Sequence, residues 1–167
     1  MPSLDISLEP QANSDLCWAA VALAVLNHYR KYNHHFPSSQ QELTAQFTRG
    51  ANEQFDVFDV LQRYGVSNGT RLGFSQTDII ASIDNNEPAI IKTGTGANSH
   101  FLLVVGYRKD DIEKFQMELK DPRNPSHSFF SRPDQVRSGV KGILFTKQPP
   151  IPKKSSTRRC ACPCVIL

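Results

Sequence analysis

The chain has 167 residues, of which 39% are hydrophobic and 21% are charged, close to the averages of globular proteins. This composition excludes an intrinsically disordered or collagen-like chain, and the length predicts one compact domain and a tail. Residues 1–146 carry 14 Lys or Arg against 16 Asp or Glu, whereas residues 147–167 carry five basic residues and no acidic one. The net charge of +3 therefore originates in the tail, and the mildly acidic domain lacks the basic surface that nucleic-acid binding requires.

The first helix is predicted over the apolar run Leu16–Leu26, which follows three polar residues suited to an N-cap, Asn13, Ser14 and Asp15. The run is apolar on nearly every face, as expected of a helix buried at the centre of a domain. Cys17 lies in the first turn of this helix.

Three further helices are predicted before residue 87. Ser-x-x-acid capping boxes at Ser39–Glu42 and Ser75–Asp78 each precede helical spacing of apolar residues. Another helix is predicted over Val57–Tyr64, ended by Gly65.

Beyond Asn86 the pattern changes to short apolar segments bounded by Gly, Pro, Asn or Asp, which is typical of strands. The predicted strands are Ala89–Lys92, Phe101–Tyr107, Phe115–Lys120, Phe129–Ser131 and Gly142–Thr146. Helices followed by an antiparallel sheet indicate an α+β fold. From Gln148 the sequence QPPIPKKSSTRRCACPCVIL has four prolines and no periodicity, so we expect a domain over residues 1–146 and a flexible tail over residues 147–167.

Cys17 is the only cysteine of the predicted domain, and the other three lie in the tail. This distribution is not a disulfide framework and favours a reducing compartment. A cysteine in the first turn of a helix, next to an imidazolium, is expected to have a lowered pKa and to act as a nucleophile. A small buried hydrophobic residue is the alternative interpretation of a lone cysteine.

Gln11 lies six residues before Cys17, and Trp18 follows the cysteine directly. In this respect the sequence resembles the papain-like cysteine proteases, in which a glutamine precedes a Cys-Trp pair by six residues. The resemblance implies that Cys17 is the nucleophile and that the Gln11 amide and the Cys17 N–H form an oxyanion hole. The segment QANSDLCWAA lacks the family's further cysteine and glycines, which separates this chain from secreted, disulfide-bonded papains.

The resemblance extends to a histidine at the start of a strand and a polar residue one strand later. His100, in GANSHFLLVVGY, fits the position of the base, and Asp121, in MELKDPRNP, fits that of the residue orienting it. Papains use asparagine there, whereas bacterial peptidases that trim double-glycine leaders and avirulence proteases of plant pathogens have aspartate followed by proline. Asn124 is an alternative for this role. The resemblance covers residues 8–146, without a family motif in residues 32–87.

The resemblance implies a papain-like fold, in which a helical half carrying the cysteine helix packs on an antiparallel sheet half. It also implies a thiol hydrolase that acts on peptide bonds of a protein or peptide substrate without a cofactor or metal. Two alternatives stay open: a deamidase or acyltransferase with the same triad, and an inactive papain-fold protein that binds a partner. A lowered Cys17 pKa would distinguish an enzyme from a binding protein.

The last four residues, Cys164-Val165-Ile166-Leu167, match a C-a-a-X prenylation signal, and the terminal leucine favours geranylgeranyl. Cys160 and Cys162 are candidates for palmitoylation, and the tail supplies basic residues that attract an anionic leaflet. The alternatives are an unmodified tail and a metal cluster, for which no local fourth ligand is present.

The start of the sequence shows no export signal, and no segment reaches the roughly 18 apolar residues of a membrane span. We therefore expect a cytosolic protein, held on the cytosolic face of a eukaryotic membrane by its lipidated tail. Because the prenyltransferases that read this box are eukaryotic and the thiol motifs resemble bacterial ones, the hypothesis is a bacterial virulence effector that a host prenyltransferase modifies.

Overall fold

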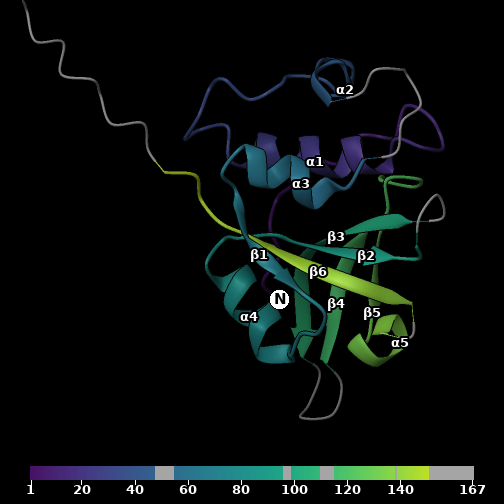
Figure 1. Cartoon of the computed structure of the whole chain (residues 1–167). Helices are drawn as coiled ribbons and strands as arrows, with labels where there is room; N and C mark the ends of the chain where they lie inside the picture. Colours follow the sequence, from purple (N-terminus) through teal and green to yellow (C-terminus); the bar gives the residue numbers. More distant parts are fainter. Residues whose placement is uncertain (48–54, 96–98, 110–114, 138, 151–167) are drawn as a thin grey trace, which may run out of the picture.

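The computed structural model of the chain describes residues 1–47, 55–95, 99–109, 115–137 and 139–150. Figure 1 shows a layered molecule in which helices cover both faces of one antiparallel sheet. The helices on one face are α1 (Cys17–His28), α2 (Gln40–Phe47) and α3 (Val57–Arg63), and those on the other are α4 (Gln76–Asp84) and α5 (Pro133–Arg137).

Within the described ranges, the sheet has six strands in the order β1-β6-β2-β3-β4-β5. The strands are β1 (Ser67–Arg71), β2 (Ala89–Thr93), β3 (His100–Lys109), β4 (Phe115–Lys120), β5 (Ser128–Ser131) and β6 (Val140–Thr146). Strands β2 and β3 lie at the centre and are apolar on both faces, because helices cover both faces. The predicted α+β fold, with a cysteine-bearing central helix on an antiparallel sheet, is confirmed.

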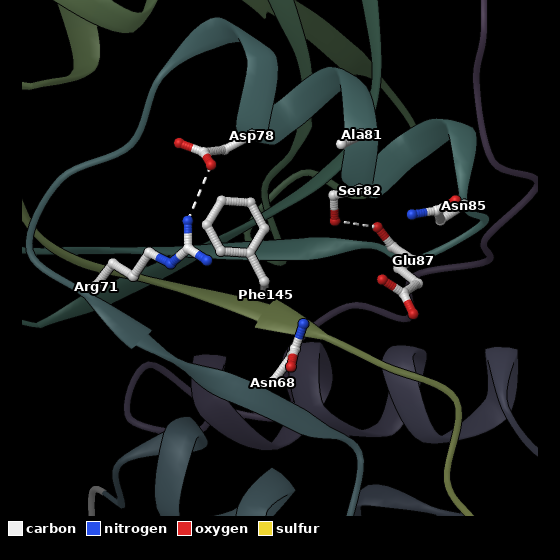
Figure 2. Close-up of a pocket in the computed structure, with 8 residues that line it drawn as sticks. All are labelled: Asn68, Arg71, Asp78, Ala81, Ser82, Asn85, Glu87 and Phe145. Carbon is white, nitrogen blue, oxygen red and sulfur yellow. Dashed lines mark hydrogen bonds and ion pairs between the residues drawn. The ribbon is translucent and has the colours of Figure 1, made fainter.

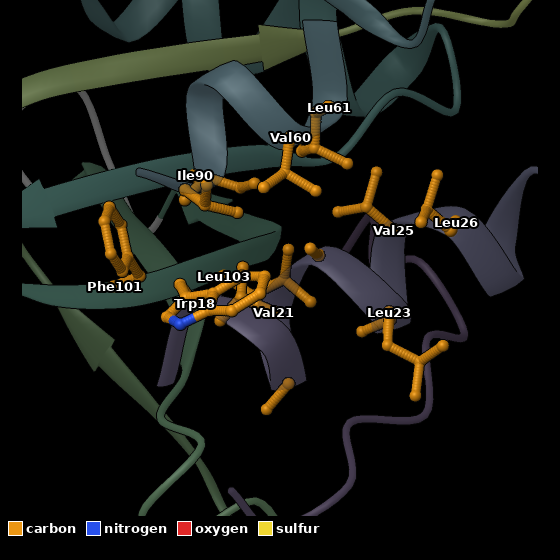
Figure 3. Packing of buried hydrophobic residues seen from close by; sticks show 14 of the residues in the cluster. Trp18, Val21, Leu23, Val25, Leu26, Val60, Leu61, Ile90, Phe101 and Leu103 are labelled. Atoms are coloured by element: carbon orange, nitrogen blue, oxygen red, sulfur yellow. The ribbon is translucent and has the colours of Figure 1, made fainter. Parts of the chain in front are cut away.

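Helix α1 is the centre of the larger hydrophobic core, and every residue from Cys17 to Leu26 is buried. Figure 3 shows Trp18, Val21 and Val25 of α1 facing side chains of α3 and of the central strands. Alternate residues of those strands belong to the second core, beneath α4, where Ile91 packs with Ile79. Burial on all sides explains why the helix sequence is apolar around its whole circumference.

The five strands predicted from the sequence are confirmed to within two residues at each end. Gly65 ends α3 as predicted, at a φ of 72° that glycine adopts without strain. Ser75 and Asp78 form the predicted capping box, with both reciprocal bonds present. Strand β1 and helix α5 were not predicted from the sequence. The first is a polar edge strand with four exposed residues, and the second is only five residues long, so neither has an apolar pattern.

Two cap predictions are wrong in detail. The N-cap of α1 is Leu16, which makes no side-chain cap bond, because the Asn13 side chain instead accepts from the N–H of Asp15 in a turn before the helix. At α2 the Ser39 hydroxyl accepts from the Glu42 N–H as predicted, but the Glu42 carboxylate binds Ser38.

Both ends of the described chain lie against the domain. The N-terminal segment pairs with β3 through an isolated bridge between Ser3 and Gly106. After β6, the Lys147 N–H donates to the carbonyl of Val66, and Pro149 is buried. None of the helices within the described residues has the length and apolar character needed to cross a membrane.

Candidate active site

The Cys17 side chain is 1% exposed and lies at the first residue of α1. Its thiol donates to the carbonyl oxygen of Ser99, with the sulfur 3.9 Å from that oxygen. The sulfur therefore contacts the residue immediately before His100, although the two residues are far apart in sequence.

Packing around Trp18 holds this end of α1 in place. The indole is fully buried, and its ring centroid lies 6.5 Å from that of Phe47 and 5.9 Å from that of Phe55. Aromatic contacts of this kind stabilise a fixed orientation of the ring. Trp18 therefore anchors the helix turn that carries the thiol.

His100 is the first residue of β3, and Asp121 directly follows β4. Because these strands are antiparallel neighbours, the start of one lies beside the end of the other, and His100 Nε2 is 2.9 Å from Asp121 Oδ1. The two side chains are 12% and 26% exposed. The other ring nitrogen, Nδ1, is buried and has no hydrogen-bond partner within the described part of the chain.

The Asp121 carboxylate accepts a second hydrogen bond through the same oxygen, Oδ1, from the N–H of Arg123 at 2.8 Å. Asn124, the alternative weighed from the sequence, instead donates its N–H to the Asp121 carbonyl, and its side-chain oxygen accepts from Ser126. The structure thus brings Asp121, and not Asn124, to the histidine.

Gln11 lies in the extended segment before α1. Its backbone N–H donates to the carbonyl of Pro122 at 3.0 Å, which links the segment to the residue after Asp121. Its side-chain Nε2 donates to the carbonyl of Asn13 at 2.8 Å, and its Oε1 is buried without a hydrogen-bond partner among the described residues. The four residues expected from the resemblance are therefore carried by one connected region, built from the start of α1, the start of β3 and the end of β4.

Burial controls the protonation of the two central groups. It raises the pKa of the Cys17 thiol, an effect that the backbone N–H groups of Phe101 and Trp18 oppose. Burial also lowers the pKa of His100, although the Asp121 carboxylate opposes this. Both shifts favour a neutral Cys17 thiol and a neutral His100 imidazole. This differs from the expectation of a lowered thiol pKa. The reason is that the protein encloses the sulfur almost completely, which a position at the start of a helix does not by itself require.

Arg123 was not singled out from the sequence. Its side chain is exposed, and its positive charge lowers the pKa of both Cys17 and His100. A single basic residue in the polar segment DPRNP carries no signal that would distinguish it from an ordinary surface residue.

Two of the cavities formed by the described residues bear on the placement of this region. The first, of about 140 Å³, is lined by Arg71, Asp78, Glu87 and neighbours and contains none of the candidate catalytic residues (Figure 2). The second, of about 320 Å³, is lined by Asp56, Lys92 and the residues that follow β2. Two of its lining residues, Lys92 and Gly94, flank Thr93 in the sequence, and Thr93 pairs with His100.

The described residues contain no group of three or more His, Cys, Asp or Glu that could hold a metal ion. The predicted lipidation residues, Cys160, Cys162 and Cys164, lie outside the described residues.

Residues 3–133 match the model of a family described as Peptidase C39 like. The chain belongs to the peptidase C39-like family. This membership and the fold identify it as a papain-like cysteine peptidase. No curated protein matches this C39-like chain.

Two of the solved structures that are similar to the chain have a TM-score above 0.5. The peptidase domain of Streptococcus ComA, a bi-functional ABC transporter involved in a quorum-sensing pathway, is 19% identical, with a TM-score of 0.56 over 86% of this chain and 99% of that domain. A C39-like peptidase from Bacillus anthracis is 11% identical, with a TM-score of 0.59 over 87% of this chain and 96% of that one. At these identities the likeness concerns the fold.

Proposed function

We propose that this C39-like peptidase hydrolyses peptide bonds through Cys17, His100 and Asp121, with Gln11 in the oxyanion hole. The observation that carries the proposal is the arrangement of His100. Its Nε2 is held by Asp121 while its buried Nδ1 has no hydrogen-bond partner among the described residues, and the Cys17 sulfur contacts the adjacent Ser99. A histidine held in this way has one nitrogen ready to accept the thiol proton.

The proposed reaction begins with a neutral thiol, because both pKa shifts favour it. A lowered Cys17 pKa in the resting protein therefore does not serve here to distinguish an enzyme from a binding protein. The Cys17 proton passes to His100 Nδ1 as the sulfur bonds to the substrate carbonyl carbon, and the negative charge moves to the carbonyl oxygen. The Gln11 amide and the Cys17 N–H stabilise that oxyanion. The imidazolium then protonates the leaving amine as the C–N bond breaks, and a thioester remains on Cys17. Water, deprotonated by His100, attacks the thioester and releases the acid and the thiol.

Asp121 keeps the imidazole in the tautomer that this sequence of steps needs. Its carboxylate accepts from Nε2–H, which leaves Nδ1 as the free base. The Asp121-Pro122 pair supports a place in the bacterial branch that includes leader peptidases and avirulence proteases.

The tail supports a second part of the proposal, that the peptidase acts on a host protein at a cytosolic membrane surface. A prenyl group on Cys164 provides one anchor, and palmitoyl groups on Cys160 and Cys162 with the basic residues of the tail provide another. One lipid chain alone binds a membrane only marginally, so the combination is what would retain the protein there. The protein would then be a bacterial effector modified by a prenyltransferase of its host.

Newly formed N-termini in a eukaryotic membrane-protein extract test the peptidase proposal. The parent chain is expected to generate new N-termini, and Cys17→Ser and His100→Ala are expected to generate none. A change in the mass of intact chains without new N-termini would instead indicate deamidation or acyl transfer. If parent and Cys17→Ser gave identical extracts, the protein would be a binding scaffold with a papain fold.

Membrane recruitment is tested separately by expressing the full chain in a eukaryotic cell and fractionating it. The parent is expected in the membrane fraction with a prenyl group on Cys164, and Cys164→Ser in the soluble fraction. A parent chain that is soluble and unchanged by Cys164→Ser would remove the membrane part of the proposal and leave the peptidase part intact.

A further inference from the structure

Gln40 is one of few buried polar residues among those that the structure describes. It is the first residue of α2, and the residue as a whole is 9% exposed. A buried amide must satisfy its hydrogen-bonding groups within the protein, and Gln40 does so on the segment that precedes α1. Its Nε2 donates to the carbonyl of Pro10 at 2.8 Å, and its Oε1 accepts from the N–H of Ala12 at 3.1 Å.

These two bonds lie on either side of Gln11. The Pro10 carbonyl belongs to the peptide group before the Cα atom of Gln11, and the Ala12 N–H belongs to the peptide group after it. Fixing the planes of both groups fixes φ and ψ of Gln11, and these angles set the direction of its Cα–Cβ bond and restrict the rotamers of its side chain. The peptide group between Pro10 and Gln11 is held by a second hydrogen bond, because its N–H, that of Gln11, donates to the Pro122 carbonyl.

The Gln11 amide has two N–H donors, of which one is used by the Asn13 carbonyl. The remaining donor stabilises an oxyanion only if the side chain already has the right direction, since this stabilisation depends on preorganised donors. Without Gln40, the two peptide groups that flank Gln11 would keep, among the described residues, a single long-range backbone bond, the one to Pro122.

We propose that Gln40 is a positioning residue for the oxyanion hole, acting through the two peptide groups that flank Gln11. The inference rests on the proposed thiol peptidase and adds a residue that lies 29 positions from Gln11, at the start of α2. Gln40 does not touch the substrate. It holds in place the backbone from which the oxyanion donor extends.

Two reactions of Cys17 separate positioning from folding. Acylation by p-nitrophenyl acetate passes through a tetrahedral oxyanion, whereas alkylation by iodoacetamide forms no oxyanion, so only acylation depends on the oxyanion hole. The full chain is used with Cys160→Ser, Cys162→Ser and Cys164→Ser, so that Cys17 is its only thiol. The measured quantity is the ratio of the two rate constants, taken at a temperature where thermal melts show each variant to be fully folded, because an unfolded chain also alkylates at Cys17.

Gln40→Met keeps the length of the side chain and removes both hydrogen bonds. It is expected to lower the ratio of the acylation rate constant to the alkylation rate constant roughly tenfold. This is a part of the roughly 10²–10³-fold loss of rate that follows removal of an oxyanion-hole donor. Combining it with Gln11→Ala should lower the ratio no further than Gln11→Ala alone. Gln40→Glu keeps the acceptor for Ala12 and loses the donor for Pro10, so it should give an intermediate loss. Gln41→Met, at the exposed neighbouring position, is the matched control and should leave the ratio unchanged.

An unchanged ratio in Gln40→Met, or losses that multiply with those of Gln11→Ala, would overturn the inference. Equal losses of acylation and alkylation would also overturn it, because they would show a structural role alone. A parent chain that alkylates at Cys17 but forms no acyl-enzyme would refute the proposed function itself, and the positioning role with it. A parent that acylates while Gln40→Met behaves as parent would refute only the positioning role.

Discussion

Replacing Asp121 by Asn tests whether the negative charge or the position of an oxygen atom matters more. In the structure a single oxygen, Oδ1, accepts from both His100 Nε2 and the Arg123 N–H, at 2.9 and 2.8 Å. An asparagine amide at this position would place its oxygen towards both donors, because its NH₂ group could satisfy neither. The imidazole should therefore keep the Nε2–H tautomer, with Nδ1 as the base.

The expected magnitude follows from the hydrogen bond that changes. A bond to a charged acceptor contributes about 1.5–3 kcal/mol and a neutral one about 1 kcal/mol, so losing the charge costs about 1 kcal/mol of imidazolium stabilisation. Asp121→Asn should reduce acylation of Cys17 roughly five- to tenfold. Asp121→Ala leaves both donors without their acceptor and the ring free to turn, and should reduce acylation roughly 10³-fold or more.

The assay is the rate of p-nitrophenol release at pH 7 from the full chain with its three tail cysteines changed to serine, with Cys17→Ser as the blank. Thermal melts of each variant give the folded fraction. A loss in Asp121→Asn as large as that in Asp121→Ala would refute the argument from the shared oxygen. If both variants released p-nitrophenol at the rate of the parent chain, Asp121 would not belong to the active site.

Three further predictions concern stability. Burial lowers the pKa of both His28 and His100 from the ordinary value of about 6.5, so just below that pH the unfolded chain binds more protons than the folded chain. The contribution of these histidines to the free energy of unfolding should be complete above about pH 6.5 and should fall as the pH drops below it. Urea midpoints at pH 5 and pH 8 measure this, and equal midpoints would contradict it. Gly106→Ala places a Cβ atom 2.6 Å from Glu118 Oε2, and overpacking of this kind should cost about 1–3 kcal/mol in urea unfolding. Ser75→Ala removes the capping box of α4 and should cost about 1 kcal/mol in the same measurement, with no effect on acylation of Cys17.

The path of the N-terminal segment depends on Gly106. A Cβ at this position would also lie 2.8 Å from the Pro2 carbonyl oxygen and 3.1 Å from Ser3 Cα, so the segment could not stay paired with β3. The predicted loss of stability is therefore a loss of this pairing, and hydrogen exchange at the Tyr107 amide, which donates to Pro2, should increase in Gly106→Ala.

The sequence was informative where one segment carried the whole signal. The run after Leu16 is apolar on every face, which predicts a central helix regardless of its neighbours, and Cys17 is in its first turn because the apolar run starts there. Short apolar strands bounded by turn residues predicted the sheet for the same reason. The resemblance to papain-like proteases marked Cys17, His100 and Asp121 as candidates, and the predicted elements placed each of them at the start or end of a helix or strand.

Contacts between segments far apart in the chain decided the features that the sequence did not predict. Strand β1 is polar and lies at the sheet edge, and it becomes a strand because β6 offers it hydrogen bonds, which no local pattern records. The bonds of Gln40 and Pro122 to the Gln11 segment join residues far apart in the chain, so only the fold brings them together. Protonation depends on the fold in the same way. The residues of the first turn of α1 favour a thiolate, but enclosure of the sulfur raises the pKa of Cys17, because desolvation depends on what packs around a group and not on its neighbours in sequence.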